Sequence, residues 1–194
     1  MTKPVCLVIG AGAGIGGNVA KKFALEGYHS FLCRRSDEQG LNKLVSKITE
    51  AGGSASSRLM NAIEDNAIED LVEDIEAHVG PIEVVIYNLG AQIGNRPLAG
   101  TPHKTFEMGW RLGTFGLYRL AYALTPLMES RGHGAILVTS ATSAMRGNRG
   151  QHSHAAAMGG RRMLCQSLNA EFAPKGIHVA HILIDGAVDS PDTL

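Results

Sequence analysis

The sequence predicts an α/β fold in which a parallel, doubly wound sheet is covered by helices on both faces. Short apolar runs alternate along the chain with longer segments of helical period. Such runs are typical of strands in a parallel sheet whose two faces are both covered. A glycine-rich turn also follows the first run and leads directly into the first helical segment. Together these observations predict repeated βα units and one sheet.

Six strands are expected, and each corresponds to one short run in the sequence. They cover residues 5–9 (VCLVI), 30–33 (SFLC), 55–60 (ASSRLM), 84–87 (VVIY), 135–139 (AILVT) and 179–184 (VAHILI). No internal repeat, low-complexity tract or linker separates them. We therefore expect one domain over residues 1–194.

Five helices are expected between and after these strands, over residues 16–25, 38–51, 66–79, about 104–129 and about 152–173. The third is amphipathic, because apolar residues recur at steps of three and four with acids on the other face. The last two are the longest and open in glycine-rich loops. Ligands of open α/β sheets bind outside the carboxyl ends of the strands, so these loops are where chemistry is expected.

The charge balance of the chain favours a small, roughly neutral partner. Lysine and arginine number 18, as do aspartate and glutamate, so the chain has no net field to attract nucleic acid or an anionic membrane. The first apolar run is too short for a membrane span or a secretory leader. Three cysteines stand far apart in apolar runs, which indicates reduced, buried thiols and a cytoplasmic location.

The glycine-rich turn GAGAGIG, residues 10–16, predicts a dinucleotide site. Glycines let the backbone approach a pyrophosphate, and the helix that follows presents free N–H groups and a positive dipole end to the phosphates. A flexible loop is the alternative. The strand-turn-helix context favours a Rossmann-type nucleotide fold, with contacts from Gly10, Gly12, Gly14, Ile15 and Gly16.

Arg34 and Arg35 close the second expected strand, where an acid would bind the ribose hydroxyls of NAD(H). An arginine at this place accommodates a 2′-phosphate instead. The alternative is a pair of solvated arginines at a strand end. The sequence therefore favours NADP(H) over NAD(H) as cofactor.

Four motifs in order make the chain similar to the short-chain dehydrogenase/reductase family. They are GAGAGIG at 10–16, YNLGA at 87–91, ILVTSATS at 136–143 and IDGAVDSP at 184–191. The resemblance covers nearly the whole chain. The family's threonine before the first glycine is replaced by Ile9, and only half of its Asn-Asn-Ala-Gly motif is kept, at Asn88 and Gly90.

The resemblance implies further cofactor contacts. The family's adenine-binding aspartate falls on Asn61, which keeps a side-chain carbonyl. Asn88 and Gly90 follow the fourth strand, and Gly186 and Val188 fall in the loop that meets the nicotinamide in the family. These residues complete the expected cofactor site.

The family's four catalytic positions all carry other residues here. Its asparagine falls on Trp110, its serine on Ala141, and its Tyr-x-x-x-Lys on His154 and Met158. The 13 positions from Ala141 to His154 match the family's spacing from serine to tyrosine. We expect the Trp110 indole to fill space that a proton-relay water needs.

Two functional hypotheses follow from these replacements. In the first, the chain transfers hydride between NADP(H) and a carbonyl or alcohol, with His154 as the acid. An imidazole titrates near 6.5 and needs no neighbouring lysine, unlike a phenol near 10. Ser140 or Thr142 would then replace the lost hydroxyl. In the second, the chain is an inactive member of the family that binds the nucleotide as a sensor or interaction module.

The pair His152 and His154 is not expected to bind a metal. Side chains two apart on a helix point to different sides, and no carboxylate or cysteine lies close in sequence to complete a ligand set. His152 is expected to face solvent. Arg161 and Arg162 are expected to meet an acidic partner or an oligomer contact, the alternative being a phosphate or an anionic substrate.

The family resemblance also implies a homodimer or homotetramer, because the last two long helices form the subunit faces in the family. Family members continue past this point with a substrate-covering segment and a seventh strand. We therefore expect the C-terminal strand and the substrate segment to be absent from this chain of 194 residues.

Overall fold

The computed structural model describes residues 2–90, 96–186 and 188, and within them six parallel strands form one sheet. The order β3-β2-β1-β4-β5-β6 confirms the predicted doubly wound α/β fold. Each expected strand forms, and its ends shift by one or two positions at most. The strands are β1 (Val5–Ile9), β2 (His29–Arg34), β3 (Ser54–Leu59), β4 (Ile82–Tyr87), β5 (Gly134–Ala141) and β6 (Ile177–Ile184).

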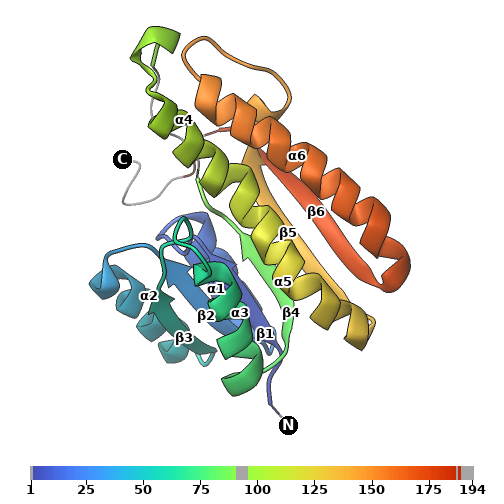
Figure 1. Ribbon diagram of the computed structural model, residues 1–194. Coiled ribbons are helices and arrows are strands. Elements are labelled where there is room, and N and C mark those ends of the chain that lie inside the picture. Colours follow the sequence, from blue (N-terminus) through green and yellow to red (C-terminus); the bar gives the residue numbers. More distant parts are fainter. Residues whose placement is uncertain (1, 91–95, 187, 189–194) are drawn as a thin grey trace.

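Helices cover both faces of the sheet, as Figure 1 shows. One core cluster joins the sheet to α1 and α2, and a larger one joins its other face to α3, α5 and α6. The strand β1 lies at the centre of both clusters because its residues are all buried. The helices are α1 (Ile15–Leu25), α2 (Glu38–Glu50), α3 (Ala67–His78), α4 (His103–Trp110), α5 (Gly116–Arg131) and α6 (His152–Phe172).

The single helix expected over about 104–129 is wrong in one respect, because a π-helical turn, η2 (Arg111–Phe115), joins α4 to α5. Figure 1 shows the three as one long rod beside α6. The turn lies over the buried Tyr87 ring, whose hydroxyl donates to the Leu112 carbonyl at 2.6 Å. Gly116 makes room for this ring, since a Cβ there would lie 2.3 Å from the hydroxyl oxygen. Packing against β4 thus decides the helix geometry locally.

The sheet order changes direction between β1 and β4, where the chain moves from one half of the sheet to the other. In open parallel sheets this switch point is where ligands bind, outside the carboxyl ends of the strands. No helix in the described part of the chain is long and apolar enough to cross a membrane.

Candidate functional site

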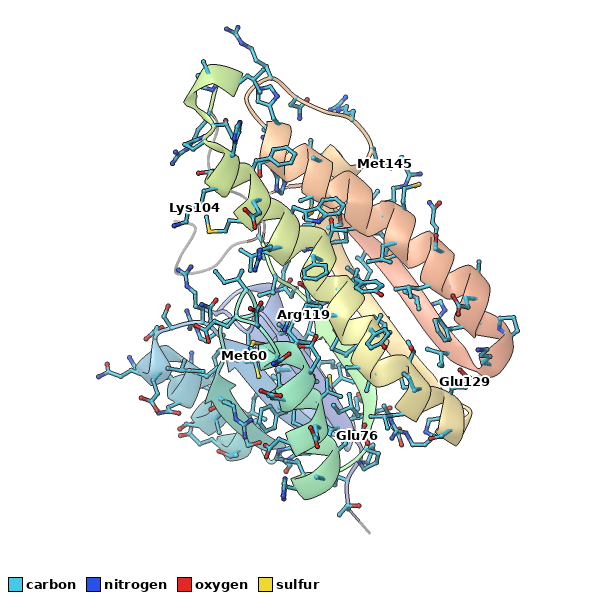
Figure 2. All side chains as sticks on the ribbon, viewed as in Figure 1. Met60, Glu76, Lys104, Arg119, Glu129 and Met145 are labelled. Atoms are coloured by element: carbon cyan, nitrogen blue, oxygen red, sulfur yellow. The ribbon has the colours of Figure 1, made fainter. Side chains whose placement is uncertain are left out.

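A cavity of about 420 Å³ opens at the switch point, at the carboxyl ends of β1 to β4. Its walls come from the segments after these strands and from one side of α4 and η2. Figure 2 labels Met60, which follows β3. The lining residues are Gly10, Gly12, Arg34, Arg35, Ser36, Met60, Asn61, Ala62, Ile63, Leu89, Gly90, Met108 and Leu112.

The glycine-rich turn forms one wall of the cavity. Its backbone lies close to Asn88, the residue that follows β4. Gly10 has φ +96°, and a Cβ on it would lie 2.5 Å from the Asn88 carbonyl oxygen. A Cβ on Gly16 would lie 2.4 Å from the Gly10 carbonyl oxygen, so the start of α1 also needs glycine. At Gly12 nothing lies within 4 Å of such an atom, which leaves its backbone open to a ligand in the cavity.

The amino end of α1 follows this turn directly. Gly14 occupies the cap position, and among the described residues no side chain caps the helix there. The first N–H groups of a helix have no partner within the helix, and the helix dipole is positive at this end. The end of α1 is therefore suited to an anionic group. Gly14, Ile15 and Gly16 lie at this end, although they do not line the cavity itself.

Two arginines and a serine form the wall at the end of β2. The Arg34 guanidinium pairs with the Asp37 carboxylate at 3.1 Å, and Asp37 in turn accepts a hydrogen bond from the Gly40 amide. Arg34 is thereby held at the strand end, whereas Arg35 and Ser36 are exposed at the rim. The structure brings both arginines to the cavity, where the sequence places the cofactor's ribose.

Asn88 connects this site to the sheet. Its side-chain amide donates to the Gly10 carbonyl at 2.9 Å, and its side-chain oxygen accepts from the Thr139 hydroxyl at 2.7 Å. Asn61 lies across the cavity after β3, with its amide bonded to Glu64 at 3.0 Å. Gly90 also lines the cavity.

The segment after β3 is fixed from α5 by Arg119, which Figure 2 also labels. The Arg119 guanidinium donates to the Ala62 and Glu64 carbonyls at 3.2 and 3.0 Å, and it pairs with the Glu69 carboxylate. This ion pair holds the pKa of Glu69 below its usual value, and it raises the pKa of Arg119. The wall that contains Asn61 and Ala62 is therefore anchored to two helices.

His154 is not among the residues that line the cavity at the switch point. It borders a hollow of only about 10 Å³ together with His152 and Arg96. One turn further along α6, Met158 is 2% exposed, and the Ser140 hydroxyl is directed at its sulfur at 3.6 Å. Thr142 is half-buried at the start of the short helix η3 (Thr142–Ala144). Met158 on α6 thus contacts Ser140 of β5, and neither His154 nor Ser140 lines the cavity that contains the glycine turn.

Trp110 is not among the residues that line the hollow beside His154. It is 42% exposed and lines an apolar groove between α4 and α6 with Phe106 and Ala156, and His154 is not part of that groove. The ring lies against Gly160, since a Cβ there would be 2.8 Å from Trp110 Cζ3. The Trp110 ring therefore packs between α4 and α6, and its effect on a relay water stays a prediction.

Arg161 also differs from expectation. Instead of an acidic partner or an oligomer contact, it is 1% exposed and donates to backbone carbonyls within the fold. Its burial lowers its pKa. The reason is its position on α6, where it lies three residues after Met158 on the side that faces the sheet. Arg162 next to it is half-buried.

Two expected cofactor contacts are not among the residues that line the cavity. Gly186 and Val188 follow β6 and are both exposed. The ends of two quoted motifs, at residue 91 and at residues 187 and 189–191, lie outside the described residues. In the described part of the chain no cluster of three or more histidine, cysteine, aspartate or glutamate side chains could hold a metal ion.

The sequence did not identify seven of the lining residues. Ser36, Met60, Ala62, Ile63 and Leu89 adjoin predicted site residues at strand ends, so proximity to those ends is a signal that finds them. Met108 and Leu112 come from α4 and η2. Their place in the cavity depends on how that rod crosses the sheet, for which the sequence carries no local signal.

The amino-acid sequence of the chain is similar to a known protein family. The family model described as short chain dehydrogenase matches residues 4–191. An uncharacterized oxidoreductase of Schizosaccharomyces pombe is 28% identical over 170 residues, which cover 87% of this chain and 64% of that protein. This chain therefore spans less than two thirds of the length of that relative.

Solved structures show the same fold. A short-chain dehydrogenase from Rhodopseudomonas palustris is 36% identical with a TM-score of 0.88, over 98% of this chain and 86% of that one. A metagenomic short-chain oxidoreductase in complex with NADP is 23% identical with a TM-score of 0.90, over 96% of this chain and 84% of that one. The second likeness shows the fold alone, and the NADP is a property of that protein.

Proposed function

Because the chain belongs to the short-chain dehydrogenase family, we propose that it binds NADP(H) in the cavity and transfers hydride between this cofactor and a carbonyl or alcohol substrate. The observation that carries the choice of cofactor is the arginine pair on the cavity wall. A guanidinium is suited to the 2′-phosphate by which NADP(H) differs from NAD(H). Arg34 is fixed by Asp37, and Arg35 is exposed at the rim.

The cavity fits a dinucleotide in two further respects. Glycine backbone at the turn and the uncapped end of α1 suit the pyrophosphate, and Asn61 and Ala62 offer a polar and an apolar surface for the adenine. When bound, the cofactor supplies or accepts the hydride. The residues that we assign to it are Gly10, Gly12, Gly14, Ile15, Gly16, Arg34, Arg35, Asn61, Asn88, Gly90, Gly186 and Val188.

We assign the proton donor to His154 and the hydroxyl contact to Thr142. Imidazole is a common general acid and base in enzymes, so His154 could protonate a substrate oxygen without the lysine that Met158 replaces. Ser140 is the weaker candidate, because it is 7% exposed and its hydroxyl is directed at the Met158 sulfur. The neutral net charge of the chain favours a small-molecule substrate.

A specific observation favours a second candidate, a member of the family that binds NADP(H) without hydride transfer. Met158 is buried and carries no charge, and the hydroxyl beside it is directed at its sulfur rather than into the cavity. His154 also lies outside the cavity. In this case the bound nucleotide would serve as a structural or sensing ligand.

Nucleotide binding tests the shared part of both candidates. We expect NADPH to bind more tightly than NADH by about 10- to 100-fold, which corresponds to one or two charge-assisted hydrogen bonds. Arg35→Ala should remove most of this preference, whereas Arg146→Ala, at an exposed arginine outside the cavity, should leave it unchanged. Equal affinity for the two nucleotides would contradict the assignment of the arginines.

Hydride transfer separates the two candidates. NADPH oxidation is followed with a panel of ketones, aldehydes and quinones. The same assay is run on the wild type and on His154→Ala. A turnover that His154→Ala abolishes supports the first candidate. NADPH binding without oxidation above background supports the second, and the double variant His154→Tyr/Met158→Lys then asks whether the scaffold still positions hydride.

An exposed aromatic surface supports the proposal of a homodimer or homotetramer. Phe115, Tyr118 and Tyr122 form a row along η2 and α5, with ring centroids 6.2 and 6.1 Å apart, and Tyr122 is 72% exposed. Phe106 and Trp110 are two further exposed rings, which line a groove between α4 and α6. Contiguous exposed aromatic rings mark protein interfaces. Sedimentation of the wild type and of Tyr122→Lys tests this assembly.

A further inference from the structure

Arg161 is a fully buried cation held by backbone oxygens. Arginine is almost never fully buried without a partner acid, yet this side chain is 1% exposed. In the described part of the chain, the hydrogen bonds of this side chain all go to backbone carbonyl oxygens. Nε donates to Gly113 at 2.7 Å, Nη1 to Thr139 at 2.7 Å, and Nη2 to Leu89 at 2.8 Å and to Leu112 at 3.4 Å.

These four carbonyls belong to three separate segments. Leu89 follows β4, Thr139 lies in β5, and Leu112 and Gly113 lie in the π-helical turn η2. Leu89 and Leu112 also line the cavity at the switch point. A single guanidinium on α6 therefore joins two parts of the cavity wall that come from different elements.

Tyr87 reaches one of these carbonyls, that of Leu112. Its hydroxyl donates to the Leu112 carbonyl at 2.6 Å, and the Arg161 guanidinium lies over its ring at 5.2 Å from the centroid. A cation over an aromatic face is attracted by the ring, more so where water is excluded. Tyr87 and Arg161 thus both donate to carbonyls of the π-helical turn.

A chain of hydrogen bonds continues from Arg161 to the glycine-rich turn. The Thr139 residue whose carbonyl accepts from Arg161 donates its hydroxyl to Asn88, and Asn88 donates to the Gly10 carbonyl. Movement of the guanidinium would therefore affect Leu89, Leu112 and Asn88 together. All three face or adjoin the cavity.

The planar, forked guanidinium is required by this arrangement. Its donors point in fixed directions and can serve several oxygens at once, whereas a lysine ammonium is a compact charge with three donors. Carbonyl oxygens buried without a donor are costly, because they have given up water without replacement. The carbonyls of η2 need such donors because the helix changes its hydrogen-bonding pattern there.

We propose that Arg161 is a positioning residue for the nucleotide: it fixes the Leu89 and Leu112 walls and the glycine-rich turn without touching the cofactor. This inference rests on the proposed NADP(H) binding. The side chain is buried behind both walls, and it is not among the residues that line the cavity. Its effect on the cofactor therefore passes through Leu89, Leu112 and Asn88.

The test compares two variants of Arg161 with one matched control. Arg161→Met keeps the length of the stem, and replacement of a buried ion by an apolar side chain is often tolerated in folding. Arg161→Lys keeps the charge and some donors. The control is Arg131→Met, because Arg131 also donates to a strand carbonyl, that of Ile82 at 3.1 Å, but at the opposite end of β4.

Affinity for NADPH is the first measurement, made well below the unfolding temperature of each variant. We expect Arg161→Met to weaken binding by about tenfold or more, equivalent to about 1.4 kcal/mol, and Arg161→Lys to restore part of this loss. Arg131→Met should lower stability and leave the affinity unchanged. Wild-type affinity in both Arg161 variants would overturn the proposal, and a wild type that binds no NADPH would overturn the proposed function instead.

Hydrogen exchange of the protein without cofactor is the second measurement. In Arg161→Met we expect faster amide exchange in the peptides that contain Leu89 and Leu112, with α2 unchanged. Arg131→Met should leave those two peptides protected. Unchanged exchange at Leu89 and Leu112 would overturn the positioning role whether or not NADPH binds. If Arg161→Met does not fold, Arg161→Lys is judged by the same two criteria.

Discussion

The side-chain amide of Asn88 donates a hydrogen bond of 2.9 Å to the carbonyl oxygen of Gly10, and so joins the end of β4 to the glycine-rich turn after β1. The backbone of Asn88 also leaves no room for a side chain at Gly10. A Cβ on Gly10 would lie 2.5 Å from the Asn88 carbonyl oxygen. The shape of the turn therefore depends on a residue 78 positions away in the sequence.

Asn88→Ala should weaken NADPH binding by about tenfold, because it removes one hydrogen bond to the turn and the acceptor of the Thr139 hydroxyl. Titration of the nucleotide measures the effect. The control is Asn169→Ala, which removes an acceptor of the Val179 amide far from the cavity. A loss of affinity that is equal in both variants would contradict a local role for Asn88.

Two adjacent glycines of α6 should respond in opposite directions to alanine. At Gly159 nothing lies within 4 Å of an added Cβ, so Gly159→Ala should stabilise the helix by roughly 0.5–1 kcal/mol. At Gly160 the new atom would lie 2.8 Å from Trp110 Cζ3 and 2.9 Å from Thr114 Oγ1, so Gly160→Ala should destabilise the fold by roughly 1–3 kcal/mol. Urea unfolding measures both, and equal effects would show that α4 and α6 are not packed as described.

The Glu69–Arg119 pair should make stability depend on pH. Its hydrogen bonds lower the pKa of Glu69, so the stabilisation is present above the ordinary carboxyl pKa and is lost as the pH falls through the lowered value. Glu69→Gln should cost about 1 kcal/mol at neutral pH, since the carboxylate is partly exposed, and almost nothing in acid. The free energy of unfolding of the wild type and of Glu69→Gln, measured from neutral pH down through the lowered pKa of Glu69, tests this prediction.

The control for this pH dependence is Glu26→Gln. Glu26 pairs with Lys22 on the surface of α1, and both side chains are more than half exposed. Water and salt screen such a pair, so its removal should change stability little at any pH. A pH-independent loss in Glu69→Gln would mean that packing rather than charge explains the effect of Glu69.

All three thiols should be unreactive in the native protein. Burial raises the pKa of Cys6 and Cys33 to about 12 and that of Cys165 to about 11, so almost no thiolate forms near neutral pH. Iodoacetamide labelling followed by mass spectrometry should find no adduct until urea is added. Labelling of native Cys165 would contradict the described packing of α6 on the sheet.

Local patterns in the sequence determined most of the fold. Each strand run and each helical period depends on neighbours within a few residues, so the six strands and the amphipathic α3 were predictable with ends within two positions. The π-helical turn was not. A carbonyl of this turn accepts from the Tyr87 hydroxyl, which lies 25 positions before Leu112 in the sequence.

The candidate site was predictable where it lies at strand ends. The glycine turn and the arginine pair follow β1 and β2, and parallel strands bring their carboxyl ends to one edge. The direction in which each side chain points was not predictable. Trp110 was expected inside the site and lies in an outer groove, because its direction depends on how α4 rotates against α6.

The sequence by itself determined the α/β order, the glycine-rich turn after β1 and the arginine pair on which the proposed 2′-phosphate contact rests. Only the tertiary structure decided what Arg161 does. On the sequence it is one of two adjacent arginines in a helix, and its carbonyl partner at Leu89 lies 72 positions away. The physical reason is that hydrogen bonds of a buried cation are satisfied by whichever oxygens the fold brings to it, and those oxygens come from three segments that meet only after folding.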